Sequence, residues 1–130
     1  PIKNRGFTLK KLLLMLLLVG PNYAKAEWLE YSVRVNGDVY FYDSVKIRKR
    51  GALLNVWNRI QYKSSVMGAR SYQSLMQIDC SNYTKQILQN TFYTDSNWTT
   101  PAIATDTQEK PKVYIKTDTA THQLVGILCD

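Results

Sequence analysis

The stretches Ala-Leu-Leu-Asn-Val-Trp-Asn-Arg-Ile-Gln-Tyr (Ala52–Tyr62) and Ser-Tyr-Gln-Ser-Leu-Met-Gln-Ile-Asp-Cys (Ser71–Cys80) decide the fold of this chain. Apolar residues recur at alternate positions in both, which is the period of a strand with one buried face. A third strand, Tyr83–Thr94, follows a tight turn at Ser81-Asn82. Because the three strands are consecutive, we expect an antiparallel meander. The residues expected on the shared face are Leu54, Val56, Ile60 and Tyr62 in the first stretch and Tyr72, Met76, Ile78 and Cys80 in the second.

A hairpin is predicted before this meander. The segment Glu27–Val35 alternates and is expected to be a strand, followed by Asn36-Gly37 and a second strand, Val39–Tyr42. Asn-Gly is the strongest short hairpin signal, because both residues tolerate positive φ. The residues expected on one face of the first strand are Leu29, Tyr31, Val33 and Val35.

The connections and the C-terminal part are less regular. Lys63–Arg70 and Asp95–Lys112 lack periodicity and are predicted to be loops, and Val113–Ile115 is predicted to be a brief strand. A closing helix is expected over Ala120–Cys129, capped by Asp118 or Thr119 and weakened by Gly126. Its expected inner face holds Ala120, Leu124 and Ile127/Leu128.

Residues 1–26 have the order of a secretory signal peptide. A basic lead precedes the short apolar run Leu12–Gly20, and Ala24-Lys25-Ala26 supplies the small-x-small pattern before Glu27. Cleavage after Ala26 would leave residues 27–130 as a single exported domain. The apolar run is too short for a transmembrane helix, which needs roughly 20 residues.

Removing the signal changes the charge balance. Five of the 17 basic residues and none of the 10 acidic ones precede Glu27, so residues 27–130 carry 12 basic and 10 acidic residues, a net charge of +2. The high pI therefore arises mostly from the targeting segment and does not indicate nucleic-acid binding, which would need a basic face on the exported domain.

Cys80 and Cys129 are the two cysteines of the chain. An even pair in an exported protein is typical of a disulfide, with two free thiols or a metal pair as the alternatives. Two cysteines that bind a metal ion would need further ligands, and His122 is the only histidine in the sequence.

One dense basic cluster lies in the exported part, formed by Lys46, Arg48, Lys49 and Arg50. Two interpretations stay open. The cluster is either a solvated hairpin tip or strand edge, where lysines discourage aggregation, or a contact for an anionic surface such as lipid headgroups, polysaccharide or nucleic acid.

The sequence offers little catalytic chemistry. No phosphate loop, metal-spaced set or paired-carboxylate motif is present, and an enzyme would need an acid/base pair among Asp38, Asp43, Asp79 and His122. Eight tyrosines lie in or beside strands of the exported part, where they serve equally as strand formers and as binding-surface residues. Trp98, in the long loop, is a candidate exposed anchor unless it folds back onto the core.

The order of these parts resembles the surface-adhesin protein E family of Gram-negative bacteria. The most specific part is Ala69-Arg70-Ser71 followed by Cys80, with the second cysteine at the extreme C-terminus. The similarity covers residues 27–129. The other segments that carry it are Glu27-Trp28, Tyr42-Asp43-Ser44, Ile78-Asp79-Cys80 and Ile127-Leu128-Cys129.

The resemblance implies an α+β fold: a twisted antiparallel β-sheet of about five to six strands with a C-terminal helix tied by one disulfide, Cys80 to Cys129. It also implies a non-enzymatic adhesin without a cofactor, which binds host extracellular-matrix proteins. The family's binding segment corresponds to Lys63–Cys80, which is less basic here, and in it Lys63, Arg70 and Tyr72 are the candidate partner-binding residues.

Two functional hypotheses follow. The first is an exported adhesin-like binding protein that uses the 63–72 segment, with Lys46, Arg48, Lys49 and Arg50 as a second patch. The second is a periplasmic structural or accessory protein of the cell envelope without a host ligand. It is favoured by Glu27, which stands where a lipoprotein has its lipid-bearing cysteine. An exposed edge strand would also allow two copies to pair as a homodimer.

Overall fold

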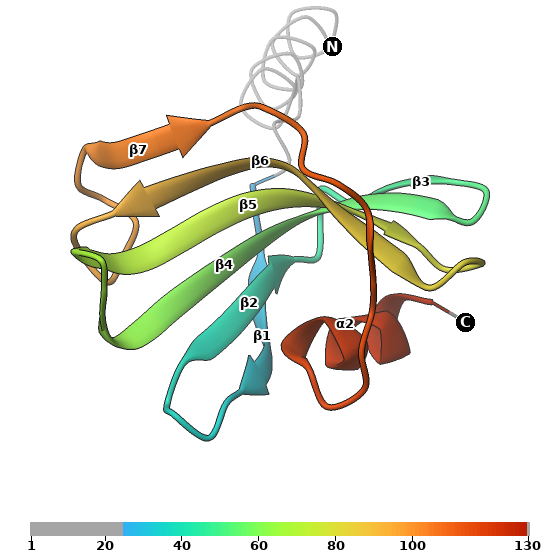
Figure 1. The fold of residues 1–130 in the computed structure, drawn as a ribbon, viewed down its shortest axis with the longest axis horizontal. Helices are drawn as coiled ribbons and strands as arrows, with labels where there is room; N and C mark the ends of the chain where they lie inside the picture. Colours follow the sequence, from blue (N-terminus) through green and yellow to red (C-terminus); the bar gives the residue numbers. More distant parts are fainter. Residues whose placement is uncertain (1–24, 130) are drawn as a thin grey trace, which may run out of the picture.

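The computed structural model describes residues 25–129, so all of the predicted signal peptide except Lys25 and Ala26 lies outside the described residues. The described part is one twisted antiparallel sheet with a helix against one face (Figure 1). In chain order its elements are β1 (Trp28–Val33), β2 (Val39–Asp43), β3 (Arg48–Arg50), β4 (Leu53–Val66), β5 (Ala69–Asp79), β6 (Thr84–Tyr93), β7 (Ala102–Asp106), β8 (Val113–Tyr114) and α2 (Ala120–Leu128).

The sheet confirms the predicted α+β class and the predicted meander. Six strands follow one another in the order β1-β2-β4-β5-β6-β7, while β3 pairs with β4 and β8 pairs with β6. Every pairing is antiparallel. No helix among residues 25–129 is both long and apolar enough to cross a membrane.

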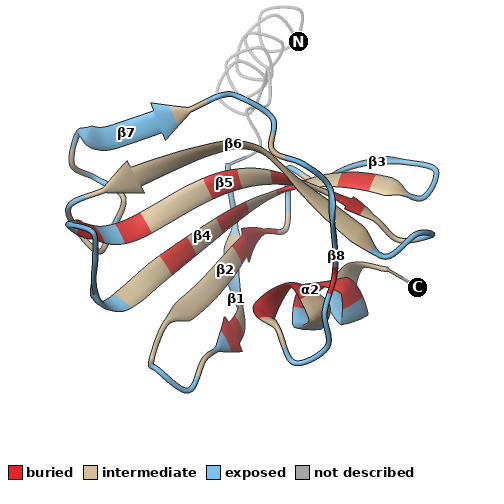
Figure 2. Cartoon of the chain, viewed as in Figure 1, coloured by how far each residue is buried: buried red, intermediate tan, exposed pale blue. Residues whose placement is uncertain are grey.

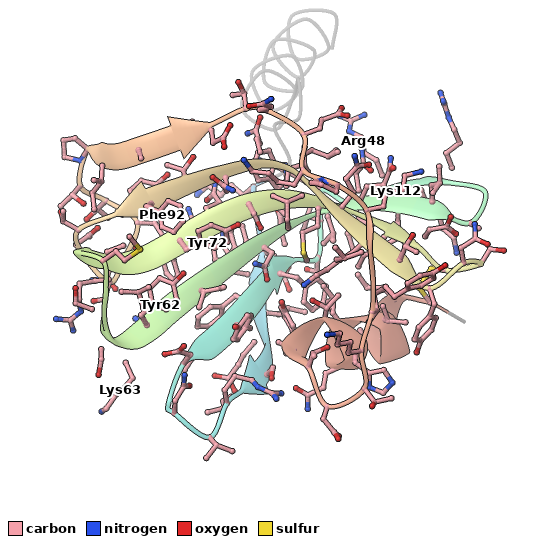
Figure 3. All side chains as sticks on the ribbon, viewed as in Figure 1. Arg48, Tyr62, Lys63, Tyr72, Phe92 and Lys112 are labelled. Carbon is pink, nitrogen blue, oxygen red and sulfur yellow. A yellow bond between two sulfur atoms is a disulfide. The ribbon has the colours of Figure 1, made fainter. Side chains whose placement is uncertain are left out.

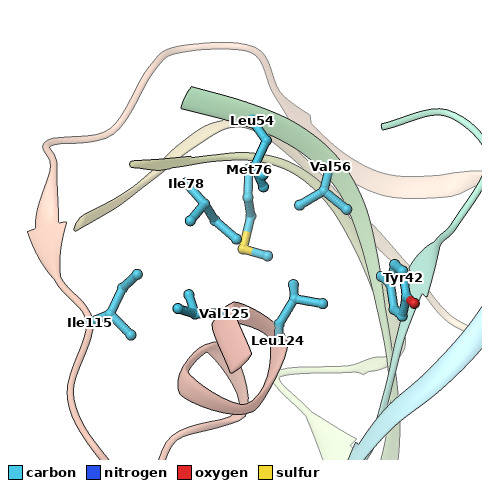
Figure 4. Packing of buried hydrophobic residues seen from close by; sticks show 8 residues of the cluster. All are labelled: Tyr42, Leu54, Val56, Met76, Ile78, Ile115, Leu124 and Val125. Carbon is cyan, nitrogen blue, oxygen red and sulfur yellow. The ribbon is translucent and has the colours of Figure 1, made fainter. Parts of the chain in front are cut away.

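The hydrophobic core lies between α2 and the concave face of the sheet (Figure 4). The alternation predicted for β4 and β5 is confirmed where α2 covers it, because Leu54, Val56, Met76 and Ile78 are all buried. Two residues of α2 complete the contact from the other side, and the cluster extends to β2 and to the residue after β8. Its members are Tyr42, Leu54, Val56, Met76, Ile78, Ile115, Leu124 and Val125.

The predicted disulfide is present. Cys80, just after β5, bonds to Cys129 at the end of α2, with their Cα atoms 5.6 Å apart. The bond therefore fastens the C-terminal end of the helix to the sheet. Thr119, one of the two predicted caps, accepts a hydrogen bond from the His122 backbone N–H through its side chain.

The inner face of α2 differs from the prediction at one position. Ala120 and Leu124 are buried as expected, but Val125 takes the place of Ile127, which is half exposed. The buried residues Ala120, Thr121, Leu124 and Val125 recur at i, i+1, i+4 and i+5, so the stripe that faces the sheet lies on the side of Thr121 and Val125 and leaves Ile127 at its margin.

The prediction of a polar loop over Lys63–Arg70 is wrong. β4 runs to Val66 and β5 begins at Ala69, so only Met67 and Gly68 form the turn. Both have positive φ, 51° and 86°, as a tight two-residue hairpin turn requires. The segment therefore forms the tip of a long hairpin.

The alternation predicted for Glu27–Val35 also fails in part. The register of β1 against β2 shifts between Glu30 and Ser32, and a bulge of this kind turns the following side chains to the other face. Ser32 is consequently buried, whereas Val33 and Val35 are exposed. The predicted Asn36-Gly37 turn is confirmed, with Gly37 at φ 94°.

The predicted loop Asp95–Lys112 contains a further strand. β7 pairs with the end of β6 at the edge of the sheet, and its first four residues are exposed (Figure 2). Backbone pairing alone holds such a strand, so its side chains show no apolar alternation for a pattern search to detect.

Candidate functional site

The predicted partner-binding residues fall into two groups at opposite ends of β4 (Figure 3). Lys63, Arg70 and Tyr72 belong to the β4–β5 hairpin, whereas the basic cluster belongs to the start of β4 and its neighbour β3. A strand of 14 residues spans roughly 45 Å at about 3.3 Å per residue. One small partner surface cannot cover both groups, and each is described separately.

Lys63 and Arg70 line one shallow depression near the tip of the β4–β5 hairpin. Its volume is about 320 Å³, and Gly37 and Ser96 also line it. The backbone N–H of Lys63 donates to Asp38 Oδ1 at 2.9 Å, which ties the β1–β2 turn to β4. Gly37 makes this approach possible, because a Cβ there would lie 3.0 Å from Lys63 Cγ.

An exposed apolar patch lies at the same tip, and the sequence analysis missed it. Val66, Met67 and Ile103 all expose substantial apolar surface, and Met67 is 100% exposed. Together with Ala69, Phe92 and Ala104 they surround a depression of about 210 Å³. The patch extends over the surface from the turn of the hairpin to β7. Because the segment that forms β7 was predicted to be a loop, no sequence pattern predicted that Ile103 lies near Met67. We call this surface, formed by Val66, Met67, Ala69, Phe92, Ile103 and Ala104, the hairpin-tip patch.

The basic cluster lies at the other end of the sheet. Arg48, Lys49 and Arg50 form β3 and are all exposed, and Lys46 is exposed in the bend before it. The three β3 residues line a depression of about 370 Å³ together with Leu53, Asn55 and Gln77. No acidic side chain lines this depression, so the cluster is a local concentration of positive charge at a short sheet edge.

Tyr72 lies in a different place from its two predicted partners. It belongs to a groove of about 410 Å³ on the concave face, between the sheet and the first turn of α2. The register places Tyr40, Ile60, Tyr72 and Phe92 in one row across β2, β4, β5 and β6. Figure 3 shows Tyr62, Tyr72 and Phe92 crossing the sheet in the part that α2 leaves uncovered. We call this the tyrosine groove; it is lined by Tyr31, Tyr40, Asn58, Ile60, Tyr62, Tyr72, Ser74, Met76, Lys85, Ile87, Phe92, Thr119, Ala120 and Thr121.

The tyrosine side chains of the groove are uncharged at neutral pH. Burial raises the pKa of Tyr31, Tyr40 and Tyr72 above the ordinary value, and burial with neighbouring phenols raises the pKa of Tyr62 to about 12. These groups are therefore phenols at neutral pH. In the floor of the groove the Tyr31 hydroxyl donates to Asn58 Oδ1, and Asn58 Nδ2 donates to Ser74 Oγ at 3.4 Å.

Lys85 is the one charged residue among those that line the tyrosine groove. Its Nζ donates to Thr121 Oγ1 at 3.0 Å, and burial lowers the pKa of its ammonium group. Among residues 25–129 the single ion pair joins Lys110 to Asp106. Lys85 thus has no carboxylate partner within the described part of the chain.

Trp98 folds back onto the convex face and is not a free anchor. Its indole N–H donates to the Tyr72 carbonyl oxygen at 2.9 Å. The Arg59 guanidinium lies over both the Trp28 ring, at 4.1 Å, and the Trp98 ring, at 4.7 Å. These contacts hold the 95–100 loop against the sheet.

The residues considered for acid/base catalysis have structural roles instead. Asp38, Asp43 and Asp79 all accept hydrogen bonds from backbone N–H groups at turns and strand ends. His122 lies on α2 with its ring 6.2 Å from the Tyr83 ring. Within residues 25–129 no three His, Cys, Asp or Glu side chains are grouped as a metal site would need.

Comparison with known proteins identifies the family. The sequence profile of surface-adhesin protein E matches residues 28–130. The chain belongs to the surface-adhesin protein E family. Membership assigns it to a family of non-enzymatic binding proteins at the bacterial surface. No curated protein matches the sequence.

Solved structures of this family share the fold. A structure of Haemophilus influenzae protein E superposes with a TM-score of 0.63 at 18% identity, covering 84% of this chain and 88% of that one. A second crystal form gives a TM-score of 0.61 at 19% identity, covering 84% and 91%. Protein E from non-typeable H. influenzae gives 0.61 at 18% identity, covering 84% and 79%. At this identity the likeness establishes the fold and leaves the ligand to be argued from the chain itself.

Proposed function

We propose that this protein is an exported adhesin that binds a host extracellular-matrix protein through the tip of its β4–β5 hairpin. The observation that carries the proposal is the hairpin-tip patch, in which exposed Val66, Met67 and Ile103 lie together. Lys63 and Arg70 flank the patch on the same hairpin.

The composition of this surface supports protein binding. Contiguous exposed apolar surface with a polar rim is typical of interaction sites on monomeric proteins. Methionine and arginine are enriched in protein interfaces, and a fully exposed methionine adapts its shape to a partner at small cost. Nothing in the fold requires Met67 or Ile103 to be apolar, since neither packs into the core.

The experiment compares two double variants of the exported protein. In the first, Met67→Asn with Ile103→Ser removes the apolar surface, and asparagine tolerates the positive φ of position 67. In the control, Val35→Ser with Tyr114→Ser removes exposed apolar surface elsewhere. Binding to immobilised extracellular-matrix proteins should weaken about tenfold or more for the first variant and stay unchanged for the control. Equal binding by both variants would reject the patch.

The basic cluster is proposed as a second contact, toward an acidic region of the partner. Replacing Lys46, Arg48, Lys49 and Arg50 by serine should weaken binding at low salt and flatten its dependence on ionic strength, because the lost attraction is screened beyond about 10 Å at 0.1 M salt. If the four-serine variant binds with the same dependence on ionic strength, the basic cluster does not contact the partner and is only a solvated strand edge.

Export is proposed to involve cleavage after Ala26, with residues 27–130 as the released domain. Lys25, Ala26 and Glu27 are exposed and precede β1, so the bond to be cut is accessible. The Glu27 nitrogen lies 3.1 Å from Oδ1 of buried Asp43. Cleavage would convert that amide into an ammonium group and the hydrogen bond into an ion pair.

Protease treatment of intact cells separates the adhesin from the periplasmic alternative. A protein at the surface is degraded when protease is added outside the cell, whereas a periplasmic accessory protein is protected until the outer membrane is opened. Complete protection in intact cells would favour the periplasmic role and exclude adhesion by this protein at the cell surface.

A further inference from the structure

We propose that the tyrosine groove binds a carboxylated sugar, a glycan unit that carries several hydroxyls and one carboxylate. This site lies on the face of the sheet beside α2, whereas the protein-binding tip uses the exposed turn and β7, and the two surfaces share Phe92. The groove holds about 410 Å³, within the range of roughly 300–1,000 Å³ that is common for small-ligand sites.

The lining of the groove suits a hydroxylated ring. Four tyrosines and one phenylalanine line it, and their flat faces can pack on the C–H face of a sugar ring. Tyrosine adds a hydroxyl at the rim of each ring, so one residue supplies apolar contact and a hydrogen bond together.

Two of these hydroxyls are available to a ligand. Within the described residues no hydrogen bond joins the hydroxyl of Tyr40 or Tyr62 to another protein group, and no buried side-chain oxygen or nitrogen lacks a partner. Both hydroxyls are therefore at least partly accessible to solvent, and both residues line the groove. As neutral phenols they can each donate and accept, which matches the dual character of sugar hydroxyls.

Lys85 is the reason why the groove should prefer a sugar that carries a carboxylate. The half-buried Lys85 ammonium group has no ionic partner among residues 25–129, and it retains donors after its bond to Thr121. A ligand carboxylate in the groove would pair with this ammonium group and form a charge-assisted hydrogen bond. The phenol groups themselves carry no negative charge, while Asp38, which is not among the lining residues, acts on Tyr40 and Tyr62 and is opposed at Tyr40 by Arg34.

A peptide fits the groove less well. A peptide that adds as a strand needs an unpaired sheet edge, but the groove lies on the face of strands that are already paired on both sides, β4 and β5 among them. A proline-rich peptide could stack on the aromatic row, but it would make no use of Lys85. This occupant is therefore the main alternative in the test.

The test measures binding of the exported protein to small soluble ligands by calorimetry. The ligands are sialyllactose and a hyaluronan tetrasaccharide, each beside its carboxyl-reduced counterpart, and decaproline. The variants are Lys85→Met, Tyr62→Phe and, as a matched control outside the groove, Lys116→Met. Thermal unfolding of each variant confirms that it is folded.

We expect at least one acidic sugar to bind, its carboxyl-reduced form to bind about tenfold more weakly, and Lys85→Met to lose that difference. Tyr62→Phe should weaken both forms alike, and Lys116→Met should change nothing. Failure of both acidic sugars to bind, equal binding of the reduced forms, or binding of decaproline alone would overturn the proposal. Because no matrix protein is present, neither result depends on the function proposed for the hairpin tip.

Discussion

Loss of the Cys80–Cys129 disulfide should destabilise the protein by about 4 kcal/mol. The bond closes a loop with a sequence separation of 49 residues, and the chain-entropy relation gives about 4 kcal/mol at 25 °C for a loop of that length. Total stability for a domain is roughly 5–15 kcal/mol, so the loss is a large share of it. For about 100 residues the melting temperature should fall by roughly 16 °C or more.

Loss of the disulfide should destabilise α2 before the rest of the domain. α2 has nine residues, and isolated helices shorter than about 12–15 residues are marginal in water. Without the bond, α2 is held by a buried stripe that contains Leu124 and Val125 and by side-chain hydrogen bonds from Lys85 and Arg34. Its amide protons should therefore exchange faster than those of β4 and β5.

The assay is urea unfolding followed by tryptophan fluorescence, with hydrogen exchange measured in parallel. It compares the oxidised protein, the same protein reduced, and the double variant Cys80→Ala with Cys129→Ala. The reduced protein and the variant should agree within about 1 kcal/mol, because the lost cross-link is common to both. A loss below about 1 kcal/mol, or unchanged protection of the α2 amides, would show that the disulfide does not hold the helix to the sheet.

Three further predictions concern other parts of the molecule. Leu124→Ala, at a fully buried position, should cost about 3–5 kcal/mol in urea unfolding, whereas Ile127→Ala on the same helix should cost under about 1 kcal/mol. In an absorbance titration Tyr62 should ionise near pH 12. Because folding raises this pKa, the free energy of unfolding should fall as the pH rises above about 10 toward 12. Ionisation of all groove tyrosines near pH 10 would contradict the burial of these side chains. Asp43→Asn should destabilise the cleaved protein that begins at Glu27 more than the protein that retains Ala26, and equal losses would show that no ion pair forms.

The sequence predicted the centre of the fold best. Apolar residues alternate in β4 and β5 because one face of these strands is buried by α2. The sequence therefore correctly predicted that Leu54, Val56, Met76 and Ile78 lie on the buried face. The disulfide followed from an even cysteine count together with predicted export. The predictions failed where local geometry overrides the pattern: at the bulge in β1 and at the positive-φ turn of Met67.

The candidate surfaces could not be assembled from the sequence. Tyr72 was singled out, but the groove exists only because the strand register brings Tyr40 and Phe92 into the same row. The hairpin-tip patch needs β7, which contains no apolar period and is held by backbone pairing. The sequence around Lys85 contains no motif that would single it out. Only the structure shows that its ammonium group bonds Thr121 and has no ionic partner among residues 25–129.

Adhesion by this protein is proposed to depend on the tip of the β4–β5 hairpin. The most direct measurement is adhesion of intact cells that display the protein to surfaces coated with extracellular-matrix proteins. Cells with Met67→Asn and Ile103→Ser are compared with cells that carry Val35→Ser and Tyr114→Ser, at equal amounts of surface protein. We expect that only the first pair of substitutions abolishes adhesion. Equal adhesion by both, or no adhesion above that of cells lacking the protein, would contradict it.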